Sequence, residues 1–348
     1  MTPDHKKKIT IALDAMGGDH APHSVVKGAH HANKRYRNLE FLMFGDESRV
    51  AALVENFSGL SAITKIIHTD DVIHDNDKPT AALRKGKNSS MYQAVGAVQE
   101  GRADGMVSAG NTGALMAISK INLKTLPGIS RPAIASIFPT VVSECVLLDL
   151  GANIDCSPEN LFEFAVMGDA FARTVLGLTH PKVGLLNIGS EEMKGNEVIK
   201  AAWQLLKNTE LPINFHGYIE GNDIAQSVVD VVVTDGFTGN VCLKTAEGTA
   251  KICGSFLKHA FQSSILAKIG YLLAKPALVT LFNKLDPRLY NGAMFLGLNG
   301  IVVKSHGGTD WLGLANAIGV AYELATHGIN EQITKELALS HVKEVPSA

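Results

Sequence analysis

Short apolar runs alternate with longer amphipathic runs along almost the whole chain. The apolar runs rich in β-branched residues have the length of strands: Ile9–Leu13, Leu39–Phe44, Ile63–His68, Gly105–Ser108, Ala133–Phe138, Cys145–Leu150, Lys182–Ile188, Val229–Thr234 and Ile301–Lys304. The segments with helical spacing are Pro22–Tyr36, Met91–Gly101, Thr112–Leu123, Pro158–Leu176, Glu197–Lys207, Asn240–Phe261 and Asp310–Thr326. Strands that alternate with helices predict a three-layer α/β/α fold with a mainly parallel sheet.

No proline-, glycine- or serine-rich linker interrupts the 348 residues. We therefore expect a single α/β/α domain over 1–348, with a helical hairpin inside it at 248–285 and a C-terminal helix and tail at 329–348. Apolar residues make up 46 % of the chain and charged residues 19 %, which provides for a large core. The net charge of −2 argues against a nucleic-acid partner.

The usual fingerprints of cofactor and metal sites are missing from the sequence. There is no G-x-G, and therefore no dinucleotide fingerprint, and there is no P-loop, G-x-S-x-G or H-E-x-x-H motif. The four cysteines form no C-x-x-C pair. The acidic loop at 68–77 fits neither an EF-hand nor a zinc motif, and we interpret it as solvated. We expect no cofactor and no metal. The basic stretch that follows, with Arg84, Lys85 and Lys87, is a candidate surface for an acidic partner or phosphate, and a plain solvated face is the alternative.

Glycines follow the predicted strands at several points. They are Gly17-Gly18, Gly110 with Gly113, Gly151, Gly189, Gly236 with Gly239, and Gly307-Gly308. The carboxyl ends of parallel strands share one edge of a sheet, and ligands bind in the crevice there. Glycine allows the backbone to approach a ligand closely, and helix N-termini attract anions. We therefore expect one phosphate-binding cradle at that edge, although any single turn could be an ordinary helix cap.

The segment 248–285 combines apolar residues with five lysines and no acidic residue. At about 100° per residue, one stripe is formed by Ile265, Leu266, Ile269, Leu272 and Leu273. Pro276 is expected to end this helix before a second apolar run at 278–282. Two short amphipathic pieces flanked by lysine predict contact with an anionic membrane. The expected contact residues are Lys268, Ile269, Leu272, Leu273 and Lys275.

Burial in a subunit interface or in the core is the alternative for this hairpin, and membrane contact and an interface can both hold in a dimer. No run in the sequence approaches about 18 uninterrupted apolar residues, the length that a spanning helix needs. We therefore expect a cytoplasmic protein that lies on the membrane and does not cross it.

Several longer motifs resemble those of the phosphate acyltransferases of bacterial glycerolipid synthesis. They are Ile11–Pro22, Lys78-Pro79, Ser89–Met91, Ser108–Ala114, Arg131-Pro132, Asp149–Asn153, Asn187–Asn196, Asp235–Asn240 and Ser305–Gly308. The resemblance extends over residues 9–327. It implies a fold similar to that of isocitrate and isopropylmalate dehydrogenases and of phosphate acetyltransferases. It also implies a homodimer that is peripheral on the inner face of the cell membrane.

The resemblance implies a reaction as well. The family transfers a long-chain fatty acyl group from acyl carrier protein to inorganic phosphate, which gives acyl phosphate for phosphatidic acid and phospholipid synthesis. The expected partners are acyl carrier protein, phosphate and the downstream enzyme that acylates glycerol 3-phosphate with acyl phosphate. Two alternatives stay open: a short-chain phosphate acetyl- or butyryltransferase that uses coenzyme A, and a non-catalytic membrane scaffold. A nicotinamide-dependent dehydrogenase is disfavoured by the missing fingerprint.

Phosphate is itself a nucleophile, so the chemistry depends on positioning and charge and needs no acylated serine or cysteine. Lys194, on a glycine-flanked turn, is expected to supply positive charge, and Asn240 and Thr238 are expected to donate hydrogen bonds. The resemblance also points to Lys194 and Asn240 as catalytic. Asp14 and His20 are expected to orient the site or move a proton. The other expected phosphate-binding residues are Gly17, Gly18, Asn111, Thr112, Asn196, His306 and Gly307. Capping or turn formation is the alternative role for the aspartate, histidine and asparagine side chains.

Overall fold

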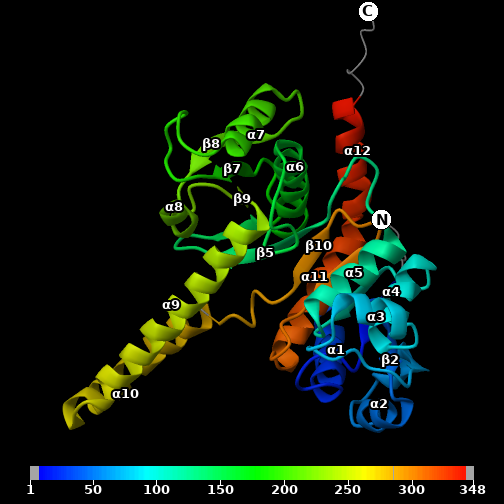
Figure 1. Ribbon diagram of the computed structural model, residues 1–348. Coiled ribbons are helices and arrows are strands. Elements are labelled where there is room, and N and C mark those ends of the chain that lie inside the picture. The colour runs from blue at the N-terminus through cyan, green and yellow to red at the C-terminus, as the bar shows by residue number, and fades with distance from the viewer. Residues whose placement is uncertain (1–7, 285, 342–348) are drawn as a thin grey trace, which may run out of the picture.

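The computed structural model describes residues 8–284 and 286–341, which form one 11-stranded sheet covered by helices (Figure 1). The strands are β1 (Ile9–Asp14), β2 (Leu39–Gly45), β3 (Thr64–His68), β4 (Gly105–Ser108), β5 (Ala133–Pro139), β6 (Glu144–Leu148), β7 (Lys182–Leu186), β8 (Asn214–Ile219), β9 (Val231–Val233), β10 (Ala293–Leu296) and β11 (Ile301–Lys304). The α-helices are α1 (His23–Arg35), α2 (Glu47–Val54), α3 (Pro79–Lys85), α4 (Ser90–Gln99), α5 (Thr112–Leu123), α6 (Pro158–Val175), α7 (Glu197–Asn208), α8 (Gly221–Gln226), α9 (Gly236–Gln262), α10 (Ile265–Lys284), α11 (Trp311–His327) and α12 (Ile329–His341).

The sheet consists of two parallel groups joined by antiparallel strands. Its order is β3-β2-β1-β4-β11-β10-β5-β6-β9-β7-β8. The first five strands run parallel to one another, and so do the last four. The three pairs between them, β11 with β10, β10 with β5, and β5 with β6, are antiparallel. Three reversals leave the two parallel groups running in opposite directions, so their carboxyl ends point in opposite directions.

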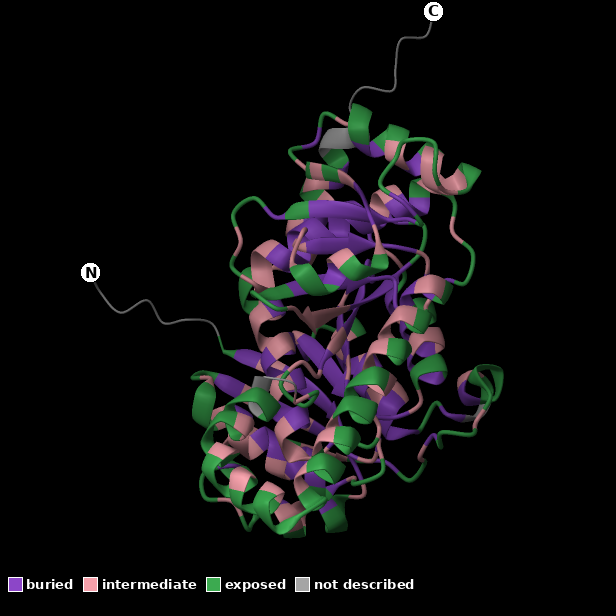
Figure 2. Ribbon diagram, turned by 90° about the vertical axis from the view of Figure 1, so that its left-hand side faces the viewer, coloured by how far each residue is buried: buried purple, intermediate pink, exposed green. Residues whose placement is uncertain are grey.

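Side chains of the central strands alternate between two hydrophobic clusters, one on each face of the sheet. In β1, Leu13 belongs to the first cluster and Ala12 to the second, and in β4 the same holds for Val107 and Met106. Helices α1, α6 and α11 contribute to the first cluster, and α4 and α5 to the second. Buried strands therefore lie between helices whose outer faces are exposed (Figure 2). The predicted three-layer, mainly parallel fold is confirmed.

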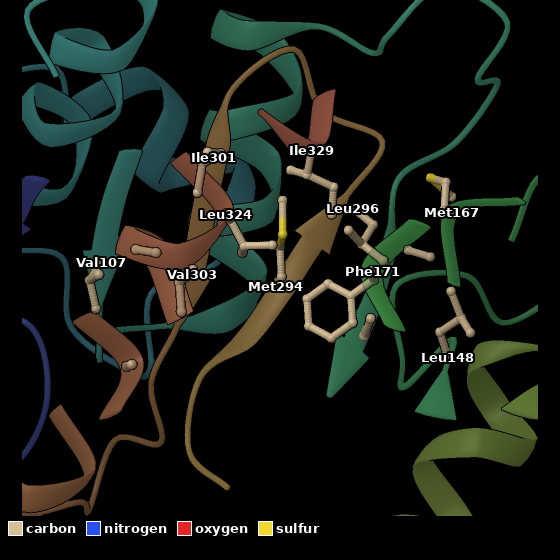
Figure 3. Packing of buried hydrophobic residues seen from close by; sticks show 14 of the residues in the cluster. Val107, Leu148, Met167, Phe171, Met294, Leu296, Ile301, Val303, Leu324 and Ile329 are labelled. Atoms are coloured by element: carbon tan, nitrogen blue, oxygen red, sulfur yellow. The ribbon is translucent and has the colours of Figure 1, made fainter. Parts of the chain in front are cut away.

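The first cluster continues from one parallel group to the other. In Figure 3, Met167 and Phe171 of α6 lie against Met294 and Leu296 of β10, with Leu324 of α11 beside them. All five side chains are fully buried. Burying a side chain of this size stabilises a fold by about 1.5–3 kcal/mol. Strand β10 therefore joins the two groups by packing as well as by hydrogen bonds.

Helices α9 and α10 form a long hairpin that projects from the body (Figure 1). Their contact includes the rings of Phe261 and Tyr271, whose centroids are 5.5 Å apart. Helix α9 begins at Gly236, before the expected start of the hairpin at 248. The start is set by Asp235, whose carboxylate accepts a hydrogen bond from the Thr238 N–H at 2.8 Å.

Helix α10 continues through Pro276, so the prediction that this proline ends the helix is wrong. A proline removes one helical hydrogen bond, and a helix supported by packing can tolerate that loss. Here α10 packs against α9, and the hydroxyl of Thr280 donates to the Pro276 carbonyl at 3.2 Å. The expected end of the hairpin at Leu285, and the tail at 342–348 after α12, lie outside the described residues.

The unbroken α10 is long and apolar enough, by length and composition, to cross a membrane. Its segment Ile265–Phe282 has a mean hydropathy of 1.6, and none of it is buried. Lys268 and Lys275 interrupt this segment, so it is not a run of about 18 uninterrupted apolar residues, which the sequence lacks. The predicted membrane-contact residues, Lys268, Ile269, Leu272, Leu273 and Lys275, are all exposed.

Candidate active site

Three loops meet at the carboxyl ends of β1, β4 and β11, which we call the Asp14 edge. The backbone N–H of Asp19, after β1, donates to the carbonyl of Gly307, after β11, at 3.0 Å. Gly18 has a φ of 96°, and a Cβ there would lie 2.8 Å from the side chain of Ala109, after β4. Only glycine fits between the loops at this position. These contacts bring the glycine turns after the three strands together.

Asp14 is buried beneath this junction. Its carboxylate accepts hydrogen bonds from the hydroxyls of Ser90 and Ser108, both at 2.6 Å. Burial raises the pKa of the carboxyl group, and the two serine hydrogen bonds oppose that shift. A Cβ on Gly17 would lie 2.4 Å from the carboxylate, so the backbone of Gly17 covers it. The buried Asp14 carboxylate therefore supports the turn that follows β1.

Both polar atoms of the Asn111 side-chain amide form hydrogen bonds. The side-chain oxygen accepts from the Ala114 N–H at 2.9 Å and caps α5. The side-chain nitrogen donates to the carbonyls of Asp75 and Asp77 at 2.8 and 3.0 Å. Asn111 therefore orders the acidic loop, and its neighbour Thr112 is exposed on the first turn of α5.

Both predicted histidines are exposed beside these loops. The backbone N–H of His306 donates to the side-chain oxygen of Asn291 at 2.9 Å. Its ring Nδ1 accepts from the Gly308 N–H at 3.2 Å. The other ring nitrogen of His306 bonds to no residue that the structure describes. His20 lines a hollow at the surface together with Trp311.

Lys304, the last residue of β11, was missing from the predicted site although it lies at the same edge. Its ammonium donates to the carbonyl of Ala109 at 3.3 Å. Burial lowers the pKa of Lys304 to about 8, and the carboxylates of Asp75, Asp14 and Asp19 oppose that shift. The Asp14 edge therefore contains a half-buried amine whose pKa lies below that of an ordinary lysine.

We expect Lys304→Met to alter how stability depends on pH. Between pH 8 and 10.5 the unfolded chain still holds the lysine proton that the folded chain has released. The free energy of unfolding of the wild type should therefore rise with pH across this window relative to the variant. Below it both states are charged, and above it both are neutral, so the difference stays constant there. Urea unfolding across the window measures this, and parallel pH profiles would contradict it.

A second set of loops meets at the carboxyl ends of β6, β9 and β7, which we call the Asp149 edge. The buried carboxylate of Asp149 accepts hydrogen bonds from the backbone N–H groups of Ile134, Gly151, Ala152 and Asn153, at 2.7 to 3.2 Å. Burial raises the pKa of this carboxyl group, and the hydrogen bonds oppose the shift. Asp149 therefore fixes the turn that follows β6, a role that the sequence analysis did not assign.

The first turn of α9 packs directly against the turn that follows β6 and contains Asp149. The backbone N–H of Gly236 donates to the carbonyl of Asn153 at 2.7 Å. A Cβ on Gly239 would lie 1.9 Å from the carbonyl oxygen of Asp149. Glycine is therefore required at both positions for the helix to approach so closely.

Two predicted donors lie on this turn of α9. The hydroxyl of Thr238 donates to the carboxylate of Asp235 at 2.8 Å, so it serves the helix cap. Asn240 is exposed, and its side-chain nitrogen donates to the carbonyl of Leu150 at 3.1 Å. One N–H of the Asn240 amide is left for a ligand, because the nitrogen has two hydrogens.

Lys194 lies in an exposed turn between β7 and α7. The buried side chain of Asn187, which follows β7, holds this turn by donating to the Lys194 carbonyl at 3.2 Å. Asn196 caps α7 by accepting from the Ile199 N–H at 2.9 Å. The Lys194 ammonium forms no ion pair with any residue in the described part of the chain. It is therefore a positive charge at a helix start that is available to an anion.

The predicted site residues thus fall into two groups, one at each edge. Lys304, at the Asp14 edge, is paired with Ala293 at the start of β10. Asp149 bonds to Ile134, which is paired with Phe295 towards the end of β10. The two edges therefore belong to strands that run in opposite directions, and their reference positions are two residues apart along β10. The prediction of a single edge is wrong because it assumed that all the strands run in one direction.

Each edge offers helix N-termini and a cationic amine, which suits an anionic ligand. Helices α5 and α11 begin at the Asp14 edge, where Lys304 lies, and α7 and α9 begin at the Asp149 edge, where Lys194 lies.

Within residues 8–284 and 286–341 there is no group of three or more His, Cys, Asp or Glu side chains that could hold a metal ion.

Known proteins with related sequences and folds identify the family. A family model described as "Fatty acid synthesis protein" matches residues 9–332. A phosphate acyltransferase of Paramagnetospirillum magneticum is 59 % identical over 94 % of this chain and 93 % of its own. Another, of Rhodospirillum centenum, is 58 % identical over 95 % of this chain and 94 % of its own.

Among solved structures, a phosphotransacetylase from Streptococcus pyogenes aligns with a TM-score of 0.61 at 19 % identity, over 92 % of this chain and 94 % of that one. This likeness shows a shared fold. The family model and the relatives at nearly 60 % identity lead to one assignment: the chain belongs to the fatty acid synthesis protein family of phosphate acyltransferases, which are acyltransferase enzymes.

Proposed function

We propose that this protein transfers a long-chain fatty acyl group from acyl carrier protein to inorganic phosphate. The observation that carries the proposal is the free ammonium of Lys194 beside the start of α7, in a chain that belongs to the phosphate acyltransferase family. An exposed lysine without an ion pair contributes little to stability. Placed at a helix start, it can hold a phosphate dianion.

The reaction needs one nucleophilic displacement. A phosphate oxygen attacks the thioester carbonyl carbon, the carbon–sulfur bond breaks, and acyl phosphate forms. The sulfur leaves as a thiolate and takes up a proton from water, since a thiol with a pKa near 8.5 needs no strong general acid. Lys194 neutralises the phosphate, and the free N–H of Asn240 donates to the oxyanion that develops on the thioester. No covalent acyl-enzyme is involved.

We also propose a homodimer in which the Asp149 edge of one subunit faces the Asp14 edge of its partner. Within one chain these edges belong to strands that run in opposite directions, although the family motifs contribute residues to both. A two-fold axis that brings unlike patches together forms two such sites at once. Each site would then combine Lys194 and Asn240 with His306 of the partner subunit.

The α9–α10 hairpin supports a peripheral position on the inner face of the cell membrane. Its exposed apolar residues lie on a projecting element that also carries exposed Lys268 and Lys275. This combination favours an anionic bilayer surface. Such a position would release acyl phosphate next to the downstream acyltransferase that consumes it.

The choice of acyl donor tests the proposed function. The purified protein is given phosphate with either palmitoyl-acyl carrier protein or acetyl-coenzyme A, and acyl phosphate is trapped with hydroxylamine. We expect turnover with the carrier-bound palmitoyl group and little with acetyl-coenzyme A. The reverse preference would indicate a short-chain phosphotransacylase, and no turnover with either donor would favour a non-catalytic scaffold.

Complementation tests the shared site. Lys194→Ala and His306→Ala are each expected to be inactive alone. In a mixed population, half the dimers carry one of each subunit, and each such dimer has one intact site out of two. Co-expression should therefore restore about a quarter of the wild-type activity. Activity that stays at the level of the single variants would place both residues in the site of one chain.

A further inference from the structure

The stretch around helix α1 is strongly basic. Between His20 and Asn38 the sequence contains four Lys or Arg residues and four His residues, and no Asp or Glu. The inner face of α1 is buried against the core through Val25, Val26, Ala29 and Ala32. The charged side chains are therefore confined to the outer face and to the C-terminal end of the helix. We call Lys27, Lys34, Arg35 and Arg37 the α1 basic face.

The α1 basic face keeps most of its charge free. Lys34, Arg35 and Arg37 are exposed. Arg35 donates to the neutral amide oxygen of Asn316 at 2.6 Å. Lys27, Lys34 and Arg37 form no ion pair with any residue in the two described stretches of chain. A surface patch with this much unpaired charge of one sign attracts a partner of the opposite sign.

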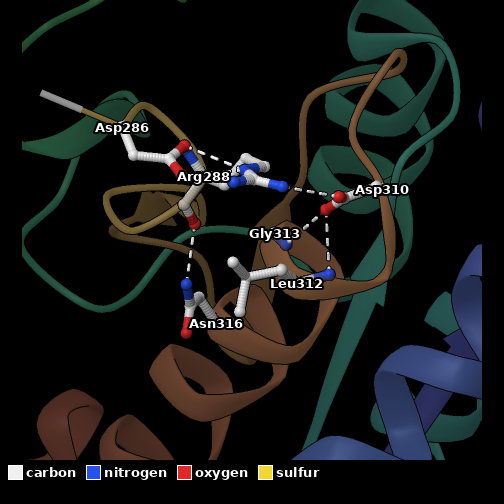
Figure 4. A network of polar contacts seen from close by, with 6 residues as sticks. All are labelled: Asp286, Arg288, Asp310, Leu312, Gly313 and Asn316. Carbon is white, nitrogen blue, oxygen red and sulfur yellow. Dashed lines mark hydrogen bonds and ion pairs between the residues drawn. The ribbon is translucent and has the colours of Figure 1, made fainter. Parts of the chain in front are cut away.

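The acidic groups near the start of α11 are already neutralised. Arg288 donates to Asp286 at 2.6 Å and to Asp310 at 2.8 Å (Figure 4). Asp310 also accepts from the backbone N–H groups of Leu312 and Gly313, which caps α11. These carboxylates therefore do not compensate the α1 basic face. Glu323, farther along α11, lies 3.5 Å from the ring nitrogen of His327.

A hollow of about 380 Å³ opens beside the α1 basic face. Its lining residues are His20, Ala21, His23, Ser24, Asp310 and Trp311. The indole of Trp311 stacks on the ring of His31 with centroids 4.1 Å apart, and Lys27 lies 4.7 Å above the same indole. The volume is within the range of small-molecule sites.

Residues that line the hollow are connected along the chain to two loops of the Asp14 edge. His20 follows the loop in which Asp19 donates to the Gly307 carbonyl. Asp310 and Trp311 follow the loop that contains Gly307 and His306. A ligand that is anchored on α1 and extends through the hollow would therefore reach the glycine turns of the Asp14 edge.

From this arrangement we infer that the α1 basic face and the adjoining hollow are the docking site for acyl carrier protein. The carrier is an acidic helical protein, and its acyl group hangs on a phosphopantetheine arm. The acidic carrier helix lies on Lys34 and Arg37, and the phosphate of the arm lies in the hollow between His20 and His23. This inference rests on the proposed function, because it takes acyl carrier protein as the donor.

An anionic membrane is a less suitable partner for this face. Helix α1 and the first turn of α11 expose no large apolar side chain among the described residues, whereas the α9–α10 hairpin exposes many. Membrane-surface helices need an apolar face that enters the bilayer. The apolar hairpin and the α1 basic face therefore suit different partners.

The test compares two pairs of charge reversals in the full-length protein. Lys34→Glu with Arg37→Glu alters the α1 basic face. Arg84→Glu with Lys87→Glu is the matched control, on the other basic stretch of the sequence. Binding of holo acyl carrier protein is measured by fluorescence anisotropy at low and at high ionic strength. The α1 pair should weaken binding about tenfold at low ionic strength and less at high, because exposed charges are screened. The control pair should bind like the wild type.

A further variant tests the hollow. The wild type should bind the holo carrier, which has the arm, more tightly than the apo carrier, which lacks it. His23→Ala should reduce that difference, because the arm's phosphate loses a partner.

Turnover provides an independent measure of the α1 pair. Lys34→Glu with Arg37→Glu should raise KM for palmitoyl-acyl carrier protein about tenfold with kcat little changed.

Three outcomes would overturn the inference. The α1 pair could bind the carrier like the wild type, the control pair could be the one that weakens binding, or the α1 pair could lose binding to phosphatidylglycerol vesicles and keep binding to the carrier. If the proposed function is wrong and the docking site is right, the experiments give a different result. In that case the holo carrier would bind at α1 in the anisotropy experiment, but no acyl phosphate would form from palmitoyl-acyl carrier protein.

Discussion

Replacing Lys194 by alanine should lower kcat for acyl phosphate formation by about 100- to 1000-fold, the usual cost of removing one group that stabilises a transition-state charge. The side chain is exposed and forms no ion pair with the described residues, so the free energy of unfolding should change by less than about 0.5 kcal/mol. The measurement is a phosphate-dependent assay with palmitoyl-acyl carrier protein, combined with urea unfolding of the same preparation.

Lys200→Ala is the matched control for this prediction. Lys200 lies on α7, the helix that Asn196 caps, and its ammonium pairs with the exposed carboxylate of Glu197 at 3.2 Å. A variant that removes this charge from the same helix should keep nearly full activity. If Lys200→Ala and Lys194→Ala lose activity equally, the effect comes from the total positive charge near α7, and the specific role of Lys194 is refuted.

Gly239→Ala should be the most destabilising single substitution of those considered, at about 3–5 kcal/mol. The added Cβ would lie 1.9 Å from the carbonyl oxygen of Asp149, so either the start of α9 or the turn after β6 has to move. Either movement disturbs the buried carboxylate of Asp149 and its backbone hydrogen bonds. Urea or thermal unfolding measures the loss, and activity should fall with it because Asn240 stands on the same turn.

Gly248→Ala provides the control on the same helix. Gly248 lies within α9, and no atom is found within 4 Å of a Cβ built there. Alanine favours a helix over glycine by about 0.8–1.0 kcal/mol, so this variant should be as stable as the wild type or more stable. Equal destabilisation by both substitutions would show that the loss comes from helix α9 in general and not from contact with Asp149.

The alternation of strands and helices could be predicted because it depends on local periodicity. The direction of most strands could not, because it depends on which distant segments pair, whereas β5 and β6 are close in sequence and form an antiparallel pair. Strand β10, Ala293–Leu296, is antiparallel to both β11 and β5, so these two strands still run in the same direction, and the reversal between the two parallel groups comes from the antiparallel pair β5 and β6. Strand β8 is an edge strand with exposed residues alternating along its first half, and it has a weak apolar signal. The prediction of a single phosphate-binding edge failed because the antiparallel pairing of β5 with β6 was not recognised.

The site was partly predictable for a similar reason. Lys194 stands out in the sequence because a lysine among glycines and asparagines has little structural purpose, and the structure leaves its ammonium free. The side chains of Asn111 and Thr238 have the right chemistry for phosphate, but the fold uses them to order a loop and to cap α9. Lys304 was missed because nothing local distinguishes a lysine half-buried at the end of a strand from one that reaches the solvent.

The most direct test of the central claim is the stoichiometry of one reaction. Purified protein is mixed with palmitoyl-acyl carrier protein with and without phosphate, and released carrier thiol and trapped acyl hydroxamate are counted together. The account predicts equal amounts of both with phosphate, and no thiol release, not even a first-turnover burst, without it. Thiol released in the absence of phosphate, or released without acyl phosphate, would contradict direct attack by bound phosphate on the thioester.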